Sequence, residues 1–479
     1  MEKEYGEQAA EGIAKSEANE YKPRTQFDHL EVISEWSKRM DLERCIKLAE
    51  EYGDDVLNFV YNCDSRGRVY ALQHGLNPQG ADFAKALLQF ANPKPISFYD
   101  FAITIANHAG QDKLSYEDRV EWVRSNSEMI YLVGSDTWSA ESLEWLESTG
   151  IAREGKSRIQ FIAAAIEYVR FMDFLDAGGD QDEFLCVIPV AYDATNSGLQ
   201  ILSALGRDEV IAPLVNISKT EKPGDVYQFV GDFVAQTHSI EKLKNFKAGE
   251  KVWRKICKRN VMTKSYAATR NGMGDQQWED RKTYGKDETD NLTVKECREL
   301  GHTVYDVCET KLLRASELMN CMKDAVTHTT KSTVSWKLPN GFTAFQVKDK
   351  SKKDKVNVRI GDEDRIQLVF YTFTDIPHIV KHKFAIAPDI VHSFDAWLLI
   401  SIVNDMPVGA NLAFVHDQFG SDSIHGGDIQ DVAKTNYKHV CSRTVLSLVL
   451  EQVAGKEVEL PEPGSWDIKE VEEADYIVC

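Results

Sequence analysis

The sequence predicts an α+β fold, and three observations support this prediction. Apolar residues recur at intervals of three and four over much of the chain, which is the period of amphipathic helices. Two short apolar runs, FLCVIPVA at 184–191 and NLAFV at 411–415, are typical of buried strands. Residues 332–374 carry hairpin signals. Helices and strands therefore occur in separate runs, which favours α+β over a regular alternation.

Composition bounds the kind of protein. The 479 residues include 56 Lys and Arg and 76 Asp and Glu, which gives a net charge of −20. This length corresponds to about three domains of roughly 150 residues each. Purely apolar stretches are far shorter than the ~20 residues that span a bilayer, and the charged N-terminus lacks the apolar core of a signal peptide. Nine cysteines without a CxxC pair indicate neither a disulfide framework nor a zinc ribbon. We expect a cytosolic protein without a membrane segment.

The first half of the chain is predicted to be mainly helical. Residues 1–26 are polar and are expected to form a tail that orders on a partner. From Phe27 to about Tyr61 the apolar spacing predicts amphipathic helices. Helical patterns return at 82–108, 117–132 and 157–175. The first strand-like run then leads into Asp193.

The second half adds hairpins and a second strand. Three segments are predicted as a basic helix, a further helical region and hairpins, at 251–271, 292–330 and 332–374. Pro339–Asn340–Gly341 marks a turn, and KDKSKKDK at 348–355 is expected to be a charged loop. The run at 411–415 is predicted as a strand that leads into Asp417.

Two acidic residues at the ends of separate buried strands are the first candidates for chemistry. Asp193 and Asp417 occupy these positions. Two-metal phosphoryl transfer needs carboxylates held rigidly together, so that two Mg²⁺ ions about 3.5–4 Å apart contact the attacking and leaving oxygens. Asp is also common in ordinary turns after strands, and that reading stays open.

A basic helix in an acidic chain is the second candidate. KVWRKICKRNVMTK, Lys251–Lys264, holds six basic residues and no acidic one. Arg254, Lys258, Met262 and Tyr266 lie four apart, so they could present two cations and a ring to a triphosphate and its sugar. A solvated surface face is the alternative reading.

Two further patterns are weaker. GIAREGKS at 150–157 fits the phosphate-loop pattern, but charged helical sequence precedes it instead of the buried strand that this loop requires, so a helix junction is expected. His378 and His382 are spaced like a zinc pair, yet no third ligand stands nearby. His392 lies in a helix-like run just before Asp395 and is structural unless other features place it in a site.

Taken together, five segments resemble the single-subunit RNA polymerases of bacteriophages and mitochondria. In chain order they are DSRGRVYALQHGLNPQG (64–80), PVAYDATNSGLQ (189–200), RKICKRNVMTKSY (254–266), APDIVHSFDAW (387–397) and FVHDQFG (414–420). They occur in the family's order over roughly residues 30–479. The resemblance implies a right-hand polymerase with palm and fingers, in which the thumb and the N-terminal promoter domain are largely absent.

The resemblance also implies roles at the catalytic centre. Asp193 and Asp417 would hold two Mg²⁺ ions, with the backbone carbonyl of Ala194 helping and His416 supporting Asp417. Lys258 would meet the triphosphate and protonate the departing pyrophosphate.

Further residues are implied for substrate binding, and by resemblance Arg254 would also meet the triphosphate. Tyr266 would stack near the nucleotide and shape the ribose pocket with Tyr227. His392 would contact the ribose 2′-hydroxyl. Arg66 and Arg68 would lie near the substrate site.

Sugar choice depends on a separate position. The R-x3-K-x7-Y helix also occurs in a family of DNA polymerases, which place a Glu five residues after the first Asp to exclude a 2′-hydroxyl. Here that residue is Gly198, which favours ribonucleotides. The chain departs from the family by Ala194 and Ala267, where Gly is common, and by its ending ADYIVC.

The implied division of the chain has five parts: a polar tail (1–26), a helical thumb remnant or partner contact (27–60), the first part of the palm (61–221), the fingers with a hairpin insertion (222–392), and the second part of the palm (393–479). Family members carry several hundred residues before the first motif, whereas 63 precede Asp64 here. We therefore expect a heterodimer, in which a second subunit supplies the missing elements for promoter use. DNA template, RNA product and ribonucleoside triphosphates are the other expected partners, together with a single-stranded-DNA-binding protein that recruits the enzyme.

Three alternatives remain from the sequence. The chain could be a DNA polymerase or primase-like polymerase of the same fold. It could be a binding subunit with a polymerase fold and no catalysis. The phosphate-loop pattern leaves an NTPase as the third reading.

Overall fold

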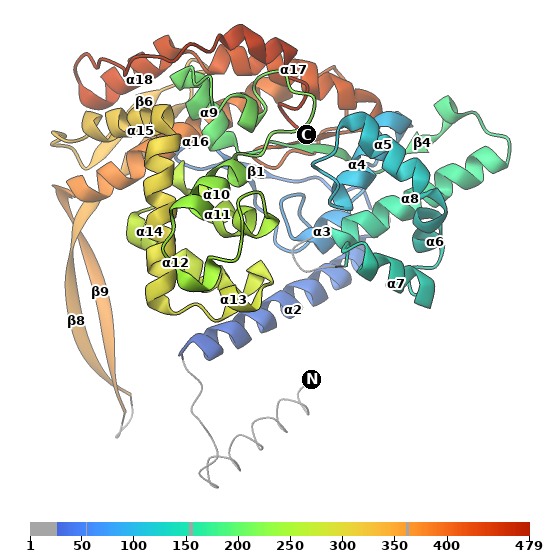
Figure 1. Cartoon of the computed structure of the whole chain (residues 1–479), viewed down its shortest axis with the longest axis horizontal. Helices are drawn as coiled ribbons and strands as arrows, with labels where there is room; N and C mark the ends of the chain where they lie inside the picture. Colours follow the sequence, from blue (N-terminus) through green and yellow to red (C-terminus); the bar gives the residue numbers. More distant parts are fainter. Residues whose placement is uncertain (1–25, 54, 153–156, 361–363) are drawn as a thin grey trace.

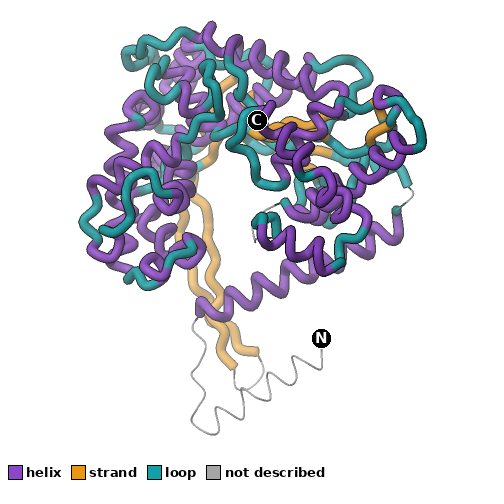
Figure 2. Tube along the Cα trace, turned by 45° about the vertical axis from the view of Figure 1, so that its right-hand side comes forward, coloured by secondary structure: helices purple, strands orange, loops and turns teal. Residues whose placement is uncertain are grey.

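The fold is α+β, as predicted, with helices predominating. The computed structural model describes residues 26–53, 55–152, 157–360 and 364–479. Among these residues, the strands pair only as two-stranded antiparallel ribbons, set between helices (Figure 2). One hydrophobic core runs through most of the molecule, and Trp253 and Trp336 are its largest fully buried side chains.

The chain begins with a long helix, α2 (Gln26–Tyr52). The prediction of helices as far as Tyr61 is wrong beyond Tyr52, because Gly53 follows and Gly has a low helix propensity. The chain then extends through exposed residues into β1 (Tyr61–Cys63), which pairs with β2 (Val69–Ala71).

A first group of helices packs beside these ribbons (Figure 1). It comprises α3 (Asp82–Ala86), α4 (Phe98–His108), α5 (Tyr116–Ser125), α6 (Ser127–Ser135), α7 (Ala140–Ser148) and α8 (Arg158–Asp176). Asp82 of α3 accepts hydrogen bonds from the backbone N–H of Ile159 (2.8 Å) and the side chain of Gln160 (2.9 Å). Because these groups lie in the first turn of α8, the carboxylate acts as its N-terminal cap and fixes α3 against it.

The apolar run at 184–191 forms two strands because Pro189 cannot donate a backbone hydrogen bond. The first, β4 (Leu185–Cys186), pairs with β3 (Lys94–Pro95). The second, β5 (Val190–Asp193), pairs with β10 (Gln418–Ser421).

The second predicted strand is displaced. Residues 411–415 form only isolated bridges, such as Leu412 with Ser421, and the regular strand β10 follows Asp417. Asp417 lies in a tight turn, in which Val415 and Gln418 exchange backbone hydrogen bonds of 2.9 Å. His416, the first central residue of this turn, has a φ of 56°. The chain therefore reverses at 416–417, and this geometry is not visible in an apolar pattern.

A second group of helices faces the first across the strands (Figure 1). It comprises α9 (Ser197–Gly206), α10 (Val226–Thr237), α11 (Lys251–Lys264), α12 (Arg270–Asp280), α13 (Asp287–Asp290), α14 (Val294–Lys311) and α15 (Leu313–Ala325). Thr293 and Glu296 form a capping box that starts α14. Short 3-10 helices occur at 181–183, 213–215, 241–243, 281–284, 423–425 and 468–473.

Two hairpins follow, as predicted. β6 (Thr333–Lys337) pairs with β7 (Thr343–Val347) around the Pro339–Asn340–Gly341 turn. β8 (Asp349–Ile360) and β9 (Asp364–Pro377) form a long ribbon that projects from the body (Figure 1). The expected charged loop at 348–355 is therefore wrong, because most of it forms strand β8. Cross-strand contact with the apolar and aromatic residues of β9 explains why these lysines are extended.

Three long helices complete the fold: α16 (Ile379–Asp405), α17 (Gly426–Val440) and α18 (Arg443–Ala454). α16 is long and apolar enough to cross a bilayer by length and composition. However, 72% of its apolar window is buried inside the molecule, as expected of a core helix. It passes without a break through residues 392 and 393, where the sequence predicted a domain boundary.

Candidate active site

The two predicted carboxylates meet at the β5–β10 pair. Gln418, the neighbour of Asp417, lies directly opposite Asp193 in the antiparallel register. The backbone N–H of Ala194 donates to the carbonyl of Asp417 at 3.0 Å, which fixes the turn against β5. Asp193 is exposed at the end of β5, yet the protein around it and the charge of Asp417 raise the pKa of its carboxyl to about 7. Residues 224 positions apart in sequence therefore share one electrostatic environment.

The donor set suits a hard divalent cation. Two neighbouring carboxylates repel each other, and Mg²⁺ binds oxygen ligands and relieves that repulsion. Over the described ranges, no cluster of three or more His, Cys, Asp or Glu side chains could hold a metal ion. The other ligands must then be backbone oxygen, water or substrate, as is common for Mg²⁺ with phosphate substrates.

α11 presents the predicted cations to this pair. Its apolar face, which includes Trp253 and Ile256, is buried against α10 and α14, so Arg254 and Lys258 face away from the core. The charge of Lys258 opposes the rise in the pKa of Asp193. Arg254 Nε donates to Asp225 Oδ2 at 2.5 Å.

The tyrosine of this motif does not lie on the helix. α11 ends at Lys264, and Tyr266 follows in a turn whose next residue, Ala267, has a φ of 60°. The expected position on one helix face is therefore wrong. The turn instead places the ring of Tyr266 4.5 Å from that of His392.

His392 and Arg66 form a polar unit beneath Tyr266. Arg66 Nη1 lies 2.7 Å from His392 Nδ1, and Arg66 is also held by Asp64, with Nη2 at 2.6 Å from Oδ2. A guanidinium only donates, so Nδ1 accepts and a neutral His392 carries its proton on Nε2. Burial, followed by the charges of Arg68 and Arg66, lowers the pKa of His392 to about 3. His392 is therefore neutral at pH 7, with one N–H free to donate.

Arg68 is anchored by a residue that the sequence analysis did not select. Its Nη2 donates to Asp395 Oδ2 on α16, and the Asp395 side chain is only 3% exposed. Burial raises the pKa of Asp395 to about 6, against the charge of Arg68. The available signal was its position three residues after His392, which places both on adjoining parts of one helix face.

Tyr227 and His416 line the same region. The Tyr227 hydroxyl donates to the Thr195 carbonyl at 3.1 Å, and the ring lies under the guanidinium of Arg254, 5.6 Å away. The ring of His416 is 4.8 Å from that of Tyr70. Burial and the charge of Arg68 lower the pKa of His416.

Gly198 is tightly enclosed. A Cβ at this position would lie 2.6 Å from Ser265 Oγ, 3.0 Å from Ser265 Cβ and 3.2 Å from Tyr266 Cε1. The absence of a side chain therefore lets α9 approach the turn that carries Tyr266.

Sequence reasoning also missed Lys85 and the last two residues. Lys85 Nζ donates to Gln418 Oε1 at 3.2 Å, and its charge opposes the rise in the pKa of Asp193. A lysine within the apolar run FAKALLQF was the available signal. Cys479 exchanges backbone hydrogen bonds with Asp193 (2.9 and 3.3 Å), and Val478 bridges Ala194. The ending that differs from the family thus lies beside β5.

The weaker candidates lie elsewhere. The segment at 150–157 follows helix α7, so the strand required for a phosphate loop is absent there; Gly155 and Lys156 lie outside the described residues. His378 caps the start of α16, and buried His382 lies 2.8 Å from the amide of Gln346. Neither histidine joins the aspartate pair.

Comparison with known proteins identifies the family of the chain. The family described as DNA-dependent RNA polymerase matches residues 96–457. The chain is 27% identical to T7 RNA polymerase of Escherichia phage T7, with 92% of this chain and 55% of that protein aligned. It is 27% identical to the mitochondrial DNA-directed RNA polymerase 1 of Arabidopsis thaliana (92% and 46% aligned) and 25% identical to the DNA-directed RNA polymerase of Enterobacteria phage K11 (92% and 54% aligned). The chain thus spans about half the length of these relatives. Because the family match covers most of the sequence, the chain belongs to the DNA-dependent RNA polymerase family.

Proposed function

We propose that this chain catalyses DNA-templated RNA synthesis, adding ribonucleotides to an RNA 3′-hydroxyl with release of pyrophosphate. The observation that carries the proposal is the meeting of Asp193 and Asp417 at the β5–β10 pair, with Lys258 close by. Phosphoryl transfer depends mainly on positioning and on charge neutralisation, and this arrangement supplies both.

The carboxylates of Asp193 and Asp417, with the backbone carbonyl of Ala194, would hold two Mg²⁺ ions. When bound, these ions neutralise charge on the phosphate and activate the attacking hydroxyl. Lys258 and Arg254 bind the triphosphate, and Lys258 donates a proton to the departing pyrophosphate. His416 braces the turn that carries Asp417 through its contact with Tyr70.

Ribose recognition is assigned to the neutral His392. Its free Nε2–H donates to the 2′-hydroxyl, while Arg66 holds the opposite ring nitrogen. Tyr266 and Tyr227 form the walls of this pocket, and Arg68 lies beside it. Gly198 carries no side chain that could exclude the 2′-hydroxyl, so ribonucleotides are preferred.

The proposed function includes a division of the chain into parts, which rests on the resemblance of its motifs. We assign 61–221 and 393–479 to the palm and 222–392 to the fingers, with α16 crossing their junction as one continuous helix. Residues 27–60 are assigned to a remnant of the thumb or to a partner contact. The thumb and the promoter domain are then largely absent from these residues.

The β8–β9 ribbon is assigned to promoter DNA. Its register places Lys353 opposite Tyr371, Lys355 opposite Val369, and Asn357 opposite Gln367 on one face. Cations and amide side chains on a two-stranded ribbon suit the major groove. Lys355→Ala should weaken promoter binding and reduce its salt dependence by about one phosphate contact.

We further propose that the chain uses promoters as part of a heterodimer with a second polypeptide. The heterodimer is encoded by a phage and acts in the host cytoplasm. The exposed apolar residues Ile33, Trp36 and Met40 on α2 support this, at 59%, 51% and 44% exposure. A recruiting single-stranded-DNA-binding protein is part of the same proposal. Co-purification from the native source tests it, and a fully active monomer on linear promoter DNA would contradict it.

Primed synthesis on single-stranded DNA tests the activity itself. The protein is given Mg²⁺ with either ribo- or deoxyribonucleotides, and RNA synthesis should dominate. Asp417→Asn should abolish nucleotide addition without altering the circular dichroism spectrum. Preference for deoxyribonucleotides would indicate a DNA polymerase or primase-like enzyme, and inactivity of the native complex would indicate a non-catalytic binding subunit.

A further inference from the structure

We propose that Lys85 binds the 3′-terminal phosphodiester of the RNA strand, on the side of the aspartate pair opposite Lys258. The proposal rests on the function proposed above and adds a substrate contact to it. It starts from the register of the central strands. Gln418 and Asp193 are directly opposite each other, so their side chains project from the same face of the β5–β10 pair. Lys85 reaches Gln418 Oε1 on that face, at 3.2 Å.

The two ammonium groups come from different groups of helices. Lys85 belongs to α3, which packs on α8 and α2, whereas Lys258 belongs to α11, which packs on α10 and α14 (Figure 1). Asp193 belongs to the β5–β10 pair, and the two helix groups face each other across the strands, so the two cations belong to opposite groups (Figure 1).

The chemistry assigns different ligands to these cations. In phosphoryl transfer, the attacking and leaving oxygens lie roughly in line on opposite sides of the phosphorus. If Lys258 and Arg254 hold the pyrophosphate end, the RNA 3′-end must approach from the other side. Lys85 comes from the first helix group, so its natural ligand is the phosphodiester next to the reacting hydroxyl.

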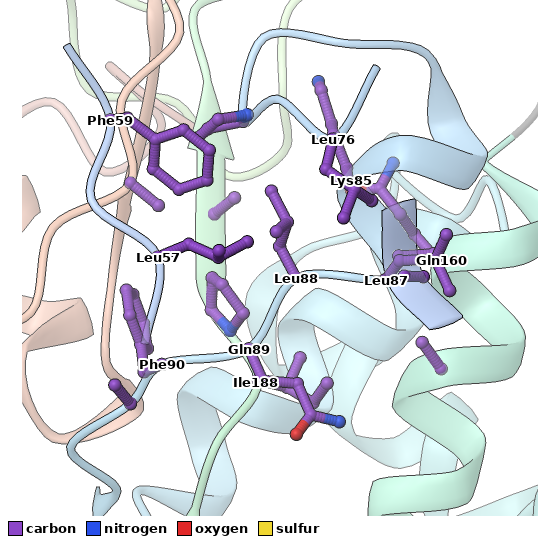
Figure 3. A pocket seen from close by; sticks show the side chains of 18 of the residues that line it. Leu57, Phe59, Leu76, Lys85, Leu87, Leu88, Gln89, Phe90, Gln160 and Ile188 are labelled. Carbon is purple, nitrogen blue, oxygen red and sulfur yellow. The ribbon is translucent and has the colours of Figure 1, made fainter. Parts of the chain in front are cut away.

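The surroundings of Lys85 leave room for such a ligand. Lys85 lines a cavity of about 650 Å³ (Figure 3), whose walls mix polar groups with apolar side chains such as Leu57, Leu88 and Ile188. Among the described residues, Lys85 forms no ion pair, and its hydrogen-bond partner is the uncharged amide of Gln418. The carboxylates of Asp193 and Asp82 act on the charge of Lys85, but its direct hydrogen-bond partner is uncharged, so a phosphate would add a charge-assisted hydrogen bond.

The backbone position of Lys85 is set by contacts of other residues of α3 and does not depend on the lysine charge. α3 is held by the hydrogen bonds of Asp82 to the first turn of α8, and Ala84 is buried beneath it. A variant at Lys85 should therefore keep its backbone in place.

The experiment compares primers that differ by one charge. RNA primers annealed to DNA template carry either a normal phosphodiester or a neutral methylphosphonate at the 3′-terminal linkage. Their dissociation constants are measured by fluorescence anisotropy, and single-nucleotide addition is followed in parallel. The proteins are wild type, Lys85→Met, Lys85→Gln and the control Lys113→Met, which alters a lysine paired with Asp112 away from the site.

For wild type and Lys113→Met, the neutral linkage should weaken primer binding about tenfold, as expected for loss of a charge-assisted hydrogen bond. Lys85→Met should bind the normal primer about tenfold more weakly and should show less than a twofold further loss with the neutral linkage. Lys85→Gln removes the charge but keeps a polar side chain, so it gives the same comparison if Lys85→Met does not fold.

Two results would overturn the proposal. One is a Lys85 variant that still discriminates tenfold between the primers, and the other is a wild-type protein that is indifferent to the linkage while adding nucleotides normally. Failure of wild type to extend any primer would instead refute the proposed function, so the two failures are distinguishable.

Discussion

Substituting Gly198 by Ala tests the packing beneath the proposed ribose pocket. The added Cβ would lie 2.6 Å from Ser265 Oγ and 3.0 Å from Ser265 Cβ, and both distances require movement. Ser265 cannot turn away freely, because it is fully buried and its hydroxyl donates to the Met262 carbonyl at 2.8 Å. Overpacking of this kind costs about 1–3 kcal/mol. We expect Gly198→Ala to lower the free energy of unfolding by this amount.

The same substitution should also affect catalysis. Displacing Ser265 moves the adjoining Tyr266, whose ring contacts His392. We expect kcat/KM for ribonucleotide addition to fall about tenfold or more, because small displacements of positioning groups are costly. Urea unfolding and single-nucleotide addition measure the two effects.

A double variant provides the control. Ser265→Gly removes both of the closest contacts and leaves the nearest remaining neighbour, Tyr266 Cε1, at 3.2 Å. In the Gly198→Ala background it should restore much of the lost stability, whereas alone it should be destabilising. Wild-type stability and activity in Gly198→Ala, or purely additive effects in the double variant, would refute the packing argument.

Three further predictions follow from the same site. His392 has a pKa of about 3 in the folded protein against an ordinary value of 6.5, so the unfolded chain takes up this proton first and the free energy of unfolding falls as the pH drops below 6.5. Between pH 7.5 and 5 the loss is about 2 kcal/mol. Urea unfolding at both pH values should show a loss smaller by this amount in His392→Gln than in wild type. Asp395→Leu should leave the guanidinium of Arg68 without its buried partner and lower the free energy of unfolding by about 3–5 kcal/mol. The double variant Arg68→Met, Asp395→Leu should lose less stability, because neither charge is left unpaired. Thermal unfolding measures both losses. Ala267→Gly should raise the free energy of unfolding in urea slightly or leave it unchanged, because a φ of 60° strains Ala but not Gly. A fall in this free energy of more than about 1 kcal/mol would contradict the prediction.

The acidic composition and the proposed nucleic-acid chemistry are compatible. The net charge of −20 describes the whole chain, whereas the charges of Lys85 and Lys258 act on Asp193 and the charge of Arg68 acts together with that of Asp417. Electrostatic attraction depends on the local arrangement of charges, since interactions beyond a Debye length of about 8 Å are screened at physiological salt.

The sequence by itself determined the elements that depend on local pattern and the residues that motifs carry. The segments predicted as helical at 82–108, 157–175 and 251–271 contain most of the helices at 98–108, 158–176 and 251–264, although Lys94–Pro95 in the first segment forms strand β3. The turn at Pro339–Asn340–Gly341 follows from its residue types. The motif residues Asp193, Asp417, Lys258 and His392 could be named because their segments match a family in order.

Only the tertiary structure decided how distant segments meet. Residues 411–415 pattern as a strand, yet β10 forms after the turn because its partner β5 lies on that side. The lysines at 350–355 are extended because β9 pairs with them, and Tyr266 meets His392 because the chain turns after α11. Lys85 and Asp395 enter the site through contacts with residues more than 300 positions away. Such contacts depend on strand register and helix packing between remote parts of the chain, and no local period or spacing encodes them.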